Sequence, residues 1–270
     1  MEKKSLHILR EMAKEVYLTV HPLLGTLKSG EIVGSGFGGD KTKLIDAVAE
    51  EAIINYLTKN DLSCIFIGEE RGVEKIGDAP RFYLITDGVD GTTNAVRGIN
   101  FASTAMAISP TDRLGDLEAA VVMDLSNGGV YAAEKGKGAF YNGEKIKPSK
   151  TVDLEDAILS IDISRAPEAV EKMIHLMKVL KSLRSLGSAS LEICLVASGL
   201  LDAYVDVRGK LRTLDIAAAM LILKEAGGLF LQPNGEEPRD VTLTKLNRFS
   251  IIAAANKKIF NEITALIPKA

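Results

Sequence analysis

The spacing of apolar residues changes twice along this chain, and these changes constrain the fold more than any other feature of the sequence. Before residue 60, apolar residues recur every three or four positions, which is the period of an amphipathic helix. This stretch predicts one helix that ends at His21-Pro22 and a second from Leu44 to about Lys59. From residue 63 the pattern changes to short strand-like runs separated by Gly, Asp and Pro. These runs predict a mostly antiparallel sheet with a hairpin that turns at Asn142-Gly143.

The second change comes near residue 150, after which strand-like and helix-like segments alternate. The segment 215–228 begins with an acid and ends in two glycines, so it predicts a helix capped by Asp215. With 270 residues, the chain is long enough for a full core and for one or two domains. We therefore expect an α/β (α+β) protein with two packed subdomains, residues 1–150 and 151–270. The first would supply most metal ligands, and the site would lie in the cleft between the two.

The charge balance limits the partners and the compartment that we expect. With 33 Lys and Arg against 36 Asp and Glu, the chain has no broad basic field for a nucleic acid. It has no signal-peptide pattern and no apolar run near the ~20 residues of a membrane span. Cys64 and Cys194 each stand in an apolar run, so both are expected to be buried thiols in a reducing compartment. We therefore expect a cytoplasmic protein without nucleic-acid or membrane partners.

The segment from Leu84 to Asn94 carries the strongest chemical signal. An apolar run leads into Asp87 and Asp90, and a glycine after each acid allows the backbone to turn sharply. The two carboxylates can therefore converge, although successive side chains of a regular strand point to opposite faces. A hard cation such as Mg²⁺ could be held between them. The alternative is an Asp-rich turn before a helix cap, since Asp-Gly turns are common.

Three nearby features fit the same chemistry. Gly91-Thr92-Thr93 stands where a helix should begin, and the free amides of a helix start bind phosphate. The apolar run 65–67 leads through a glycine into Glu69 and Glu70, and Asp215 precedes small residues at a helix start. Because the chain is acidic overall, phosphate binding would need positive charge from metal ions. Taken singly, two solvated glutamates and a plain helix cap would explain these acids.

Together, the three acidic segments resemble the inositol monophosphatase family of metal-dependent phosphatases. The family pattern is Gly-Glu-Glu, then Asp-x-x-Asp-Gly-Thr-Thr, then Asp with small residues at a helix start, and residues 68–70, 87–93 and 215–219 match it in order. The resemblance extends across essentially the whole chain, including residues 135–143. Within the family, the chain is similar to the archaeal-type branch, which often accepts fructose 1,6-bisphosphate as well as inositol monophosphates. The resemblance implies the layered αβαβα sandwich of the sugar phosphatases and a homodimer.

Carried over by position, the resemblance implies a Mg²⁺-dependent phosphatase with two or three ions in each site. The metal ligands would be Glu69, Asp87, the carbonyl of Val89, Asp90 and Asp215. The catalytic residues would be Glu69, Asp87 and Thr92. Thr92 and Glu69, with a metal, would orient and deprotonate the attacking water, so no covalent phosphoenzyme is expected. The family's usual proline after the first Asp is replaced by Gly88, which predicts a less rigid turn.

The resemblance also implies the residues that contact the substrate. The phosphate would lie beside Asp90 on the backbone amides of Gly91 and Thr92. Gly187-Ser188-Ala189 matches the place where the family contacts the substrate ring through backbone groups, with a helix cap as the alternative. Asp206 matches the family's hydroxyl-binding acid approximately. The implied substrates are inositol 1-phosphate and fructose 1,6-bisphosphate.

A group of three cations favours a bisphosphate as one substrate. Arg208, Lys210 and Arg212 stand close to Asp215 in the sequence, and in an acidic chain they could bind a second phosphate group. A solvated basic loop is the alternative.

Other functions were weighed against this one. Gly34-x-Gly36-x-x-Gly39 matches a dinucleotide fingerprint, but no clear strand is predicted before it and no strand-ending acid follows at the required distance. Asp40, in the same loop, could reach a third metal or be a solvated acid. A 3′(2′),5′-bisphosphate nucleotidase and a non-catalytic RNA-associated regulator are the alternative functions within the family.

Overall fold

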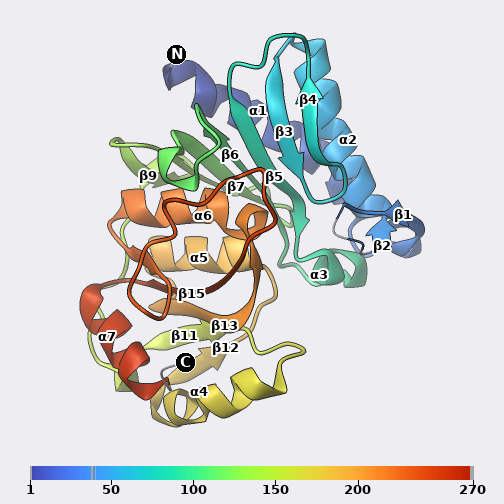
Figure 1. The fold of residues 1–270 in the computed structure, drawn as a ribbon. Coiled ribbons are helices and arrows are strands. Elements are labelled where there is room, and N and C mark those ends of the chain that lie inside the picture. Colours follow the sequence, from blue (N-terminus) through green and yellow to red (C-terminus); the bar gives the residue numbers. More distant parts are fainter. Residues whose placement is uncertain (1, 38, 40, 268–270) are drawn as a thin grey trace.

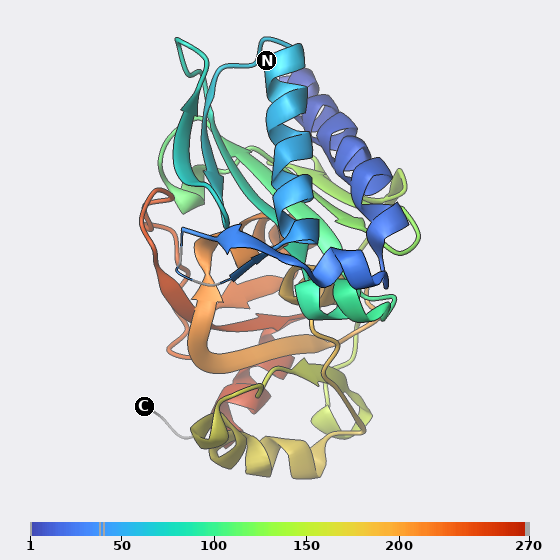
Figure 2. The same cartoon turned by 90° about the vertical axis from the view of Figure 1, so that its right-hand side faces the viewer.

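Helices and sheets alternate in five stacked layers (Figure 1). The computed structural model describes residues 2–37, 39 and 41–267, with the backbone alone for residues 2–4. The layers are, in order, helices α1 (Glu2–Val20) and α2 (Leu44–Lys59), an eight-stranded sheet, helices α5 (Ala189–Ala197) and α6 (Thr213–Ala226), a five-stranded sheet, and helices α4 (Pro167–Val179) and α7 (Lys257–Leu266). Figure 2 shows α1 and α2 side by side on the outer face of the first sheet. The predicted αβαβα sandwich is therefore confirmed.

The first sheet is built almost entirely from antiparallel neighbours. Its strands are β3 (Cys64–Gly68), β4 (Gly72–Ile76), β5 (Tyr83–Asp90), β6 (Ser103–Ser109), β7 (Ala119–Asp124), β8 (Val130–Glu134), β9 (Gly138–Tyr141) and β10 (Glu144–Lys145). They lie in the order β10-β9-β8-β7-β6-β5-β3-β4, and only β3 and β5 run parallel among the described strands of this sheet. The predicted hairpin joins β9 to β10, where Asn142 and Gly143 have φ values of 49° and 88°. Both predictions for this sheet are confirmed.

The second sheet is mixed and comes from the later half of the chain. Its strands are β11 (Ile158–Ile161), β12 (Ser182–Arg184), β13 (Ala203–Arg212), β14 (Leu229–Leu231) and β15 (Arg248–Ala254), in the order β12-β11-β13-β15-β14. It begins beyond the boundary expected near residue 150. However, α5 and α6 of this half share a hydrophobic core with the first sheet. The division into two subdomains therefore stays a prediction.

Alternation along the strands sends apolar side chains into different layers. In β5, Leu84 packs in the cluster formed with α1 and α2, whereas Ile85 packs in the cluster formed with α5 and α6. In β13, Tyr204 joins that middle cluster and Val205 joins the cluster with α4 and α7. The middle helices are thus covered on both sides. This explains why every residue from Ile216 to Leu223 of α6 is buried.

One prediction about a helix start needs correction. The N-cap of α6 is Arg212, and Asp215 instead accepts the backbone N–H of Arg212 from the third helical position. An acid at that position satisfies the free amide of the N-cap residue, whereas a capping acid would satisfy an amide of the first turn. The helix α3 (Thr92–Arg97) does begin directly after Gly91, as predicted.

The glycine-rich segment follows a strand that the sequence did not predict. This strand, β1 (Ile32–Ser35), pairs antiparallel with β2 (Lys41–Lys43). The pair is a hairpin and not the parallel β-α-β unit of dinucleotide-binding folds. Asp40 lies outside the described residues, so its role stays a prediction. Within the described ranges, no helix is both long enough and apolar enough to cross a membrane.

Candidate active site

One cavity brings together residues that are far apart in the sequence. It is lined by Glu69, Asp87, Val89, Asp90, Gly91, Thr92, Asp162, Gly187, Ala189, Arg208, Leu211, Arg212 and Asp215. These residues come from the turn after β3, the end of β5, the starts of α3, α5 and α6, the end of β11 and strand β13. All the predicted metal ligands and catalytic residues face this one cavity. Three predicted substrate contacts, Ser188, Asp206 and Lys210, are not among its lining residues.

A bulge in β5 explains how two of the acids come to face the same cavity. Asp87 pairs with Ala105 of β6 and Asp90 pairs with Ser103, so β5 has one residue more than β6 between these pairs. In a regular strand, side chains three positions apart point to opposite faces. The extra residue breaks this alternation and turns both carboxylates to one side. The bulge, and not glycine flexibility after Asp87, therefore makes the acids converge.

Of the two glycines that follow these acids, Gly91 allows the sharp turn that was predicted and Gly88 does not. Gly91 has φ of 88°, and a Cβ atom there would lie 3.0 Å from the carbonyl oxygen of Gly187. Gly88 has no positive φ, but its Cβ would lie 3.1 Å from the side chain of Ala49 in α2. Gly88 therefore allows the close approach of α2 to β5, rather than a sharp turn.

Crowding and burial raise the pKa of the clustered acids. Burial raises the pKa of Asp87 well above its usual range, and the charges of Glu69, Asp90 and Asp215 raise it further. Burial also raises the pKa of Asp90 to about 6, although hydrogen bonds from the start of α5 oppose this. The pKa of Asp215 is raised by burial against the opposing charge of Arg212. Buried like charges of this kind are stabilised by a nearby cation.

In this structure the cation among the acids is an arginine. The guanidinium of Arg212 lies 2.6 Å from Oε1 of Glu69 and 2.8 Å from Oδ1 of Asp215. As the side chains stand, the described part of the chain contains no group of three or more His, Cys, Asp or Glu residues placed to hold a metal ion. The donor set itself fits Mg²⁺, because the carboxylates and the carbonyl of Val89 that line the cavity are all hard oxygen ligands. Arg212, predicted to contact a second phosphate, thus contacts two predicted metal ligands instead.

An acid that was not predicted from the sequence contacts Thr92, the threonine predicted to be catalytic. Thr92 Oγ1 lies 3.0 Å from Oδ1 of Asp46 in α2, and 3.0 Å from the carbonyl oxygen of Val89. Burial raises the pKa of Asp46 to about 7. The sequence did contain one sign that Asp46 faces inward. It stands among the apolar residues of α2, three residues before the buried Ala49.

The loop before α5 supports the acids and also faces the cavity. Gly187 and Ala189 line the cavity, as predicted for substrate contacts. Ser188 is fully buried, and its hydroxyl donates to Oδ2 of Asp90 at 2.7 Å. The same oxygen accepts the backbone N–H and the hydroxyl of Ser190 at 2.7 and 2.5 Å. The side chain of Ser188 therefore orients Asp90.

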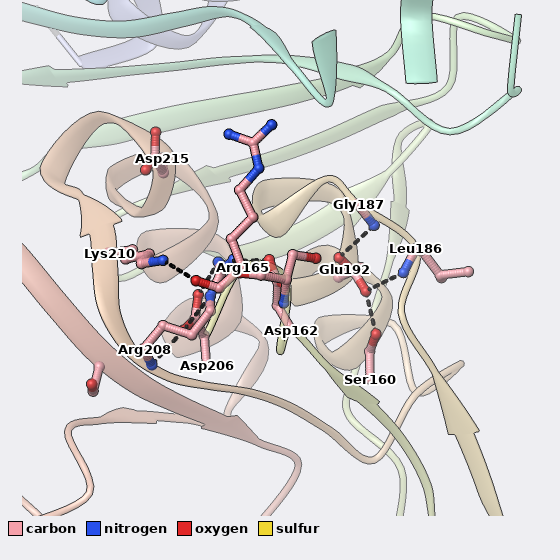
Figure 3. Close-up of polar contacts among 12 residues, drawn as sticks. Ser160, Asp162, Arg165, Leu186, Gly187, Glu192, Asp206, Arg208, Lys210 and Asp215 are labelled. Carbon is pink, nitrogen blue, oxygen red and sulfur yellow. Dashed lines mark hydrogen bonds and ion pairs between the residues drawn. The ribbon is translucent and has the colours of Figure 1, made fainter. Parts of the chain in front are cut away.

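The acid and two of the cations predicted to bind substrate are engaged with one another or with backbone (Figure 3). Asp206 is fully buried and does not face the cavity, because it binds the guanidinium of Arg208 at 2.5 Å. Arg208 also binds Asp162 at 2.6 Å and lines the cavity with it. Nζ of Lys210 donates to the carbonyl oxygen of Arg165 at 2.6 Å. The prediction that Asp206 contacts a substrate hydroxyl is therefore wrong in this arrangement.

Arg165 is a further cation that the sequence analysis missed. It is exposed and has a positive φ of 55°. Figure 3 shows its side chain extending from the loop after β11, in this view between Asp215 and Gly187, with no dashed contact to its guanidinium. A positive φ at a residue other than glycine is uncommon and was not signalled by the sequence.

The chain is similar to known phosphatases over nearly its whole length. Residues 3–270 match the model of a family described as the inositol monophosphatase family. The fructose-1,6-bisphosphatase/inositol-1-monophosphatase of Methanothermobacter thermautotrophicus is 36% identical over 93% of this chain and 92% of its own length. The bifunctional NADP phosphatase/NAD kinase of Methanococcus maripaludis is 38% identical over 86% of this chain, which spans 44% of that relative's length. A solved inositol monophosphatase-fructose 1,6-bisphosphatase structure, 30% identical, has a TM-score of 0.84 over 97% of this chain and 98% of that one.

Mg²⁺ should raise the unfolding temperature of the protein, because a bound cation would relieve repulsion among the buried acids. Asp87→Asn should reduce this rise, since it removes one of those charges. The measurement is thermal unfolding in EDTA and in excess Mg²⁺, with sodium chloride at equal ionic strength as the comparison. Asp153→Asn is the control, because Asp153 is an exposed acid paired with Lys258 outside the cavity. An equal rise in sodium chloride would contradict a specific cation site.

Asp46→Asn should make the stability of the metal-free protein less dependent on pH. The pKa of Asp46 is raised from 3.8 to about 7 on folding, so the folded state holds this proton more strongly than the unfolded chain. The stabilisation is full below the lower value and is lost as pH rises through the higher one. We expect a smaller fall in unfolding temperature between about pH 5 and 8 in the variant than in the wild type. Parallel curves for the two proteins would show that Asp46 does not titrate in this range.

Proposed function

The chain belongs to the inositol monophosphatase family of phosphoric monoester hydrolases, and we propose that it is a Mg²⁺-dependent phosphatase of small polyol and sugar phosphates. The observation that carries this proposal is the single cavity in which acids from three distant segments lie beside the first turn of α3. Such a cavity can place metal ligands and phosphate-binding amides within reach of one ester.

Each proposed role follows from the position of a group in the cavity. The cation ligands are Glu69, Asp87, the carbonyl of Val89, Asp90 and Asp215. When bound, Mg²⁺ supplies positive charge to the phosphate and lowers the pKa of water toward neutrality. The backbone amides of Gly91 and Thr92 receive the phosphate oxygens. These groups position the ester without forming a covalent bond to it.

Thr92 and Glu69 act on the attacking water. The single hydroxyl hydrogen of Thr92 has two acceptors at 3.0 Å, Asp46 and the carbonyl oxygen of Val89, and either bond leaves lone pairs available to accept a hydrogen bond from the water. We assign the donation to Asp46, because the carbonyl of Val89 is a proposed cation ligand. Glu69 takes up the water's proton as the general base. Asp46 is therefore a positioning residue that sets the direction of the Thr92 hydroxyl.

Fructose 1,6-bisphosphate and inositol 1-phosphate are the proposed substrates, in line with the name of the Methanothermobacter relative. A second candidate is the phosphate monoester of NADP, favoured by the similarity to the NADP phosphatase/NAD kinase of Methanococcus. This chain spans 44% of that relative, so we carry over no kinase activity. The adenosine bisphosphates of the nucleotidase alternative belong to the same test.

Arg165 is our candidate for binding a second anion, because it is exposed and follows the cavity-lining residue Asp162 by three positions, although it does not itself line the cavity. Arg208 and Arg212 are each paired with two carboxylates, and Lys210 is bonded to a carbonyl oxygen. In Figure 3, no dashed contact joins the guanidinium of Arg165 to the other residues drawn there. We assign to it, in place of the predicted trio, the recognition of a second phosphate or of a pyrophosphate.

Purified protein should release phosphate from at least one of inositol 1-phosphate, fructose 1,6-bisphosphate, NADP and adenosine 3′,5′-bisphosphate, and only with Mg²⁺. Glu69→Gln, Asp90→Asn and Asp215→Asn should each lower turnover at least about 100-fold, since even outer partners of metal ligands are worth 10- to 100-fold. Circular dichroism should show each variant folded. Wild-type turnover in any one of them would remove that residue from the proposed site.

Arg165→Ala should raise KM for fructose 1,6-bisphosphate about tenfold, and for inositol 1-phosphate much less, because only the bisphosphate has a second anionic group. Steady-state kinetics on both substrates give the comparison. Arg239→Ala is the control, since Arg239 is an exposed arginine paired with Glu237 outside the cavity. Equal changes in KM for the two substrates would contradict the assignment.

A further inference from the structure

A buried glutamate lies beneath the cavity loop and has no part in the roles assigned above. Glu192 stands on α5, and its residue is 2% exposed. Its Oε1 accepts the backbone N–H of Leu186 at 3.0 Å, and its Oε2 accepts that of Gly187 at 3.2 Å (Figure 3). The hydroxyl of Ser160, at the end of β11, also donates to Oε1. One carboxylate thus holds two successive amides of the loop.

The loop that Glu192 holds is fitted closely against the proposed phosphate site. Gly187 has φ of 92°, and a Cβ there would lie 3.0 Å from the side chain of Asn94. Asn94 in turn donates to the carbonyl oxygen of Leu186 at 2.6 Å. The carbonyl oxygen of Gly187 packs against Gly91 at the start of α3. Hydrogen bonds from the loop to Glu192 and from Asn94 to the loop therefore fix the position of the loop backbone.

A carboxylate satisfies this arrangement with both of its oxygens. The two adjacent N–H groups point at different oxygens of Glu192, and an ionised carboxylate has no donor on either one. A glutamine would direct its NH₂ group at one of the amides and leave that amide unpaired. Burial raises the pKa of Glu192 to about 7, and the hydrogen bonds from Ser160 and the two amides oppose this rise because they stabilise the ionised form.

We propose that Glu192 is a positioning residue that fixes the backbone of Gly187, so that this loop can contact the non-reacting part of the substrate while the phosphoryl group lies at α3. This inference rests on the proposed phosphatase function. It predicts a residue that acts on substrate binding more than on the chemical step, because the cation ligands and Thr92 do not touch Glu192.

A second glutamate that accepts two backbone N–H groups provides a matched control for Glu192. Glu225, on α6, accepts the backbone N–H groups of Gly136 and Gly138 at 2.8 and 2.9 Å through its two oxygens. It does not line the cavity. Glu225→Gln removes the same kind of contact from a loop that no substrate role involves.

The experiment compares Glu192→Gln and Glu225→Gln on two substrates in Mg²⁺. One is whichever of inositol 1-phosphate and fructose 1,6-bisphosphate the wild type hydrolyses. The other is p-nitrophenyl phosphate, whose flat ring offers no hydroxyls to the loop. We expect Glu192→Gln to raise KM for the polyol or sugar ester about tenfold, with kcat within about threefold and little change for p-nitrophenyl phosphate. Glu225→Gln should behave as the wild type on both.

The outcomes separate this inference from the proposed function. A wild type without turnover on any ester would overturn the proposed function and this inference with it. An active wild type with an unchanged KM in Glu192→Gln, or an equal loss on both substrates, would overturn this inference alone. If Glu192→Gln does not fold, Glu192→Asp gives the same test, because its shorter acid remains ionised but cannot reach both amides.

Discussion

The arrangement of the site depends on several carboxylates that lie close together between the two sheets and are largely shielded from water. Burial and mutual repulsion raise the pKa of Asp87, Asp90 and Asp215, so forming this cavity costs free energy that a plain core would not. Apolar packing on both sides of α5 and α6 stabilises the fold and offsets this free energy. Acids whose pKa is raised in this way, beside a cation such as Arg212, are typical of functional sites.

Two helices hold loops beside this site through buried glutamates. Glu50 of α2 accepts the backbone N–H groups of Glu70 and Arg71 at 2.9 and 3.0 Å, beside the proposed ligand Glu69. Glu192 holds the loop on the opposite side of the cavity in the same way. Because a carboxylate accepts two hydrogen bonds without donating any, a helix can use one to fix two backbone groups of a neighbouring loop.

The positive charges show how pairing changes the meaning of a sequence cluster. Arg208, Lys210 and Arg212 look like free cations for a second phosphate, yet each is engaged within the protein. Arg165, which stands apart from them in the sequence, is exposed and has no dashed contact to its guanidinium in Figure 3. The number of cations in a segment therefore says little about the charge that a substrate meets. The charge that a substrate meets depends on the partners of each cation, most of which come from other elements.

The sequence by itself determined the antiparallel first sheet and the Asn142-Gly143 hairpin, and its resemblance to a phosphatase family implied the layered fold and four of the acids that line the cavity, with Asp162 missed. These follow from local periodicity, turn chemistry and short motifs, which a chain expresses without knowledge of distant contacts. The tertiary structure decided what each side chain does there. The bulge that turns Asp87 and Asp90 together depends on pairing with β6, and Thr92 and Arg212 find their partners Asp46 and Glu69 in distant parts of the chain. Such contacts join residues that no short pattern relates, so only the packed layers fix them.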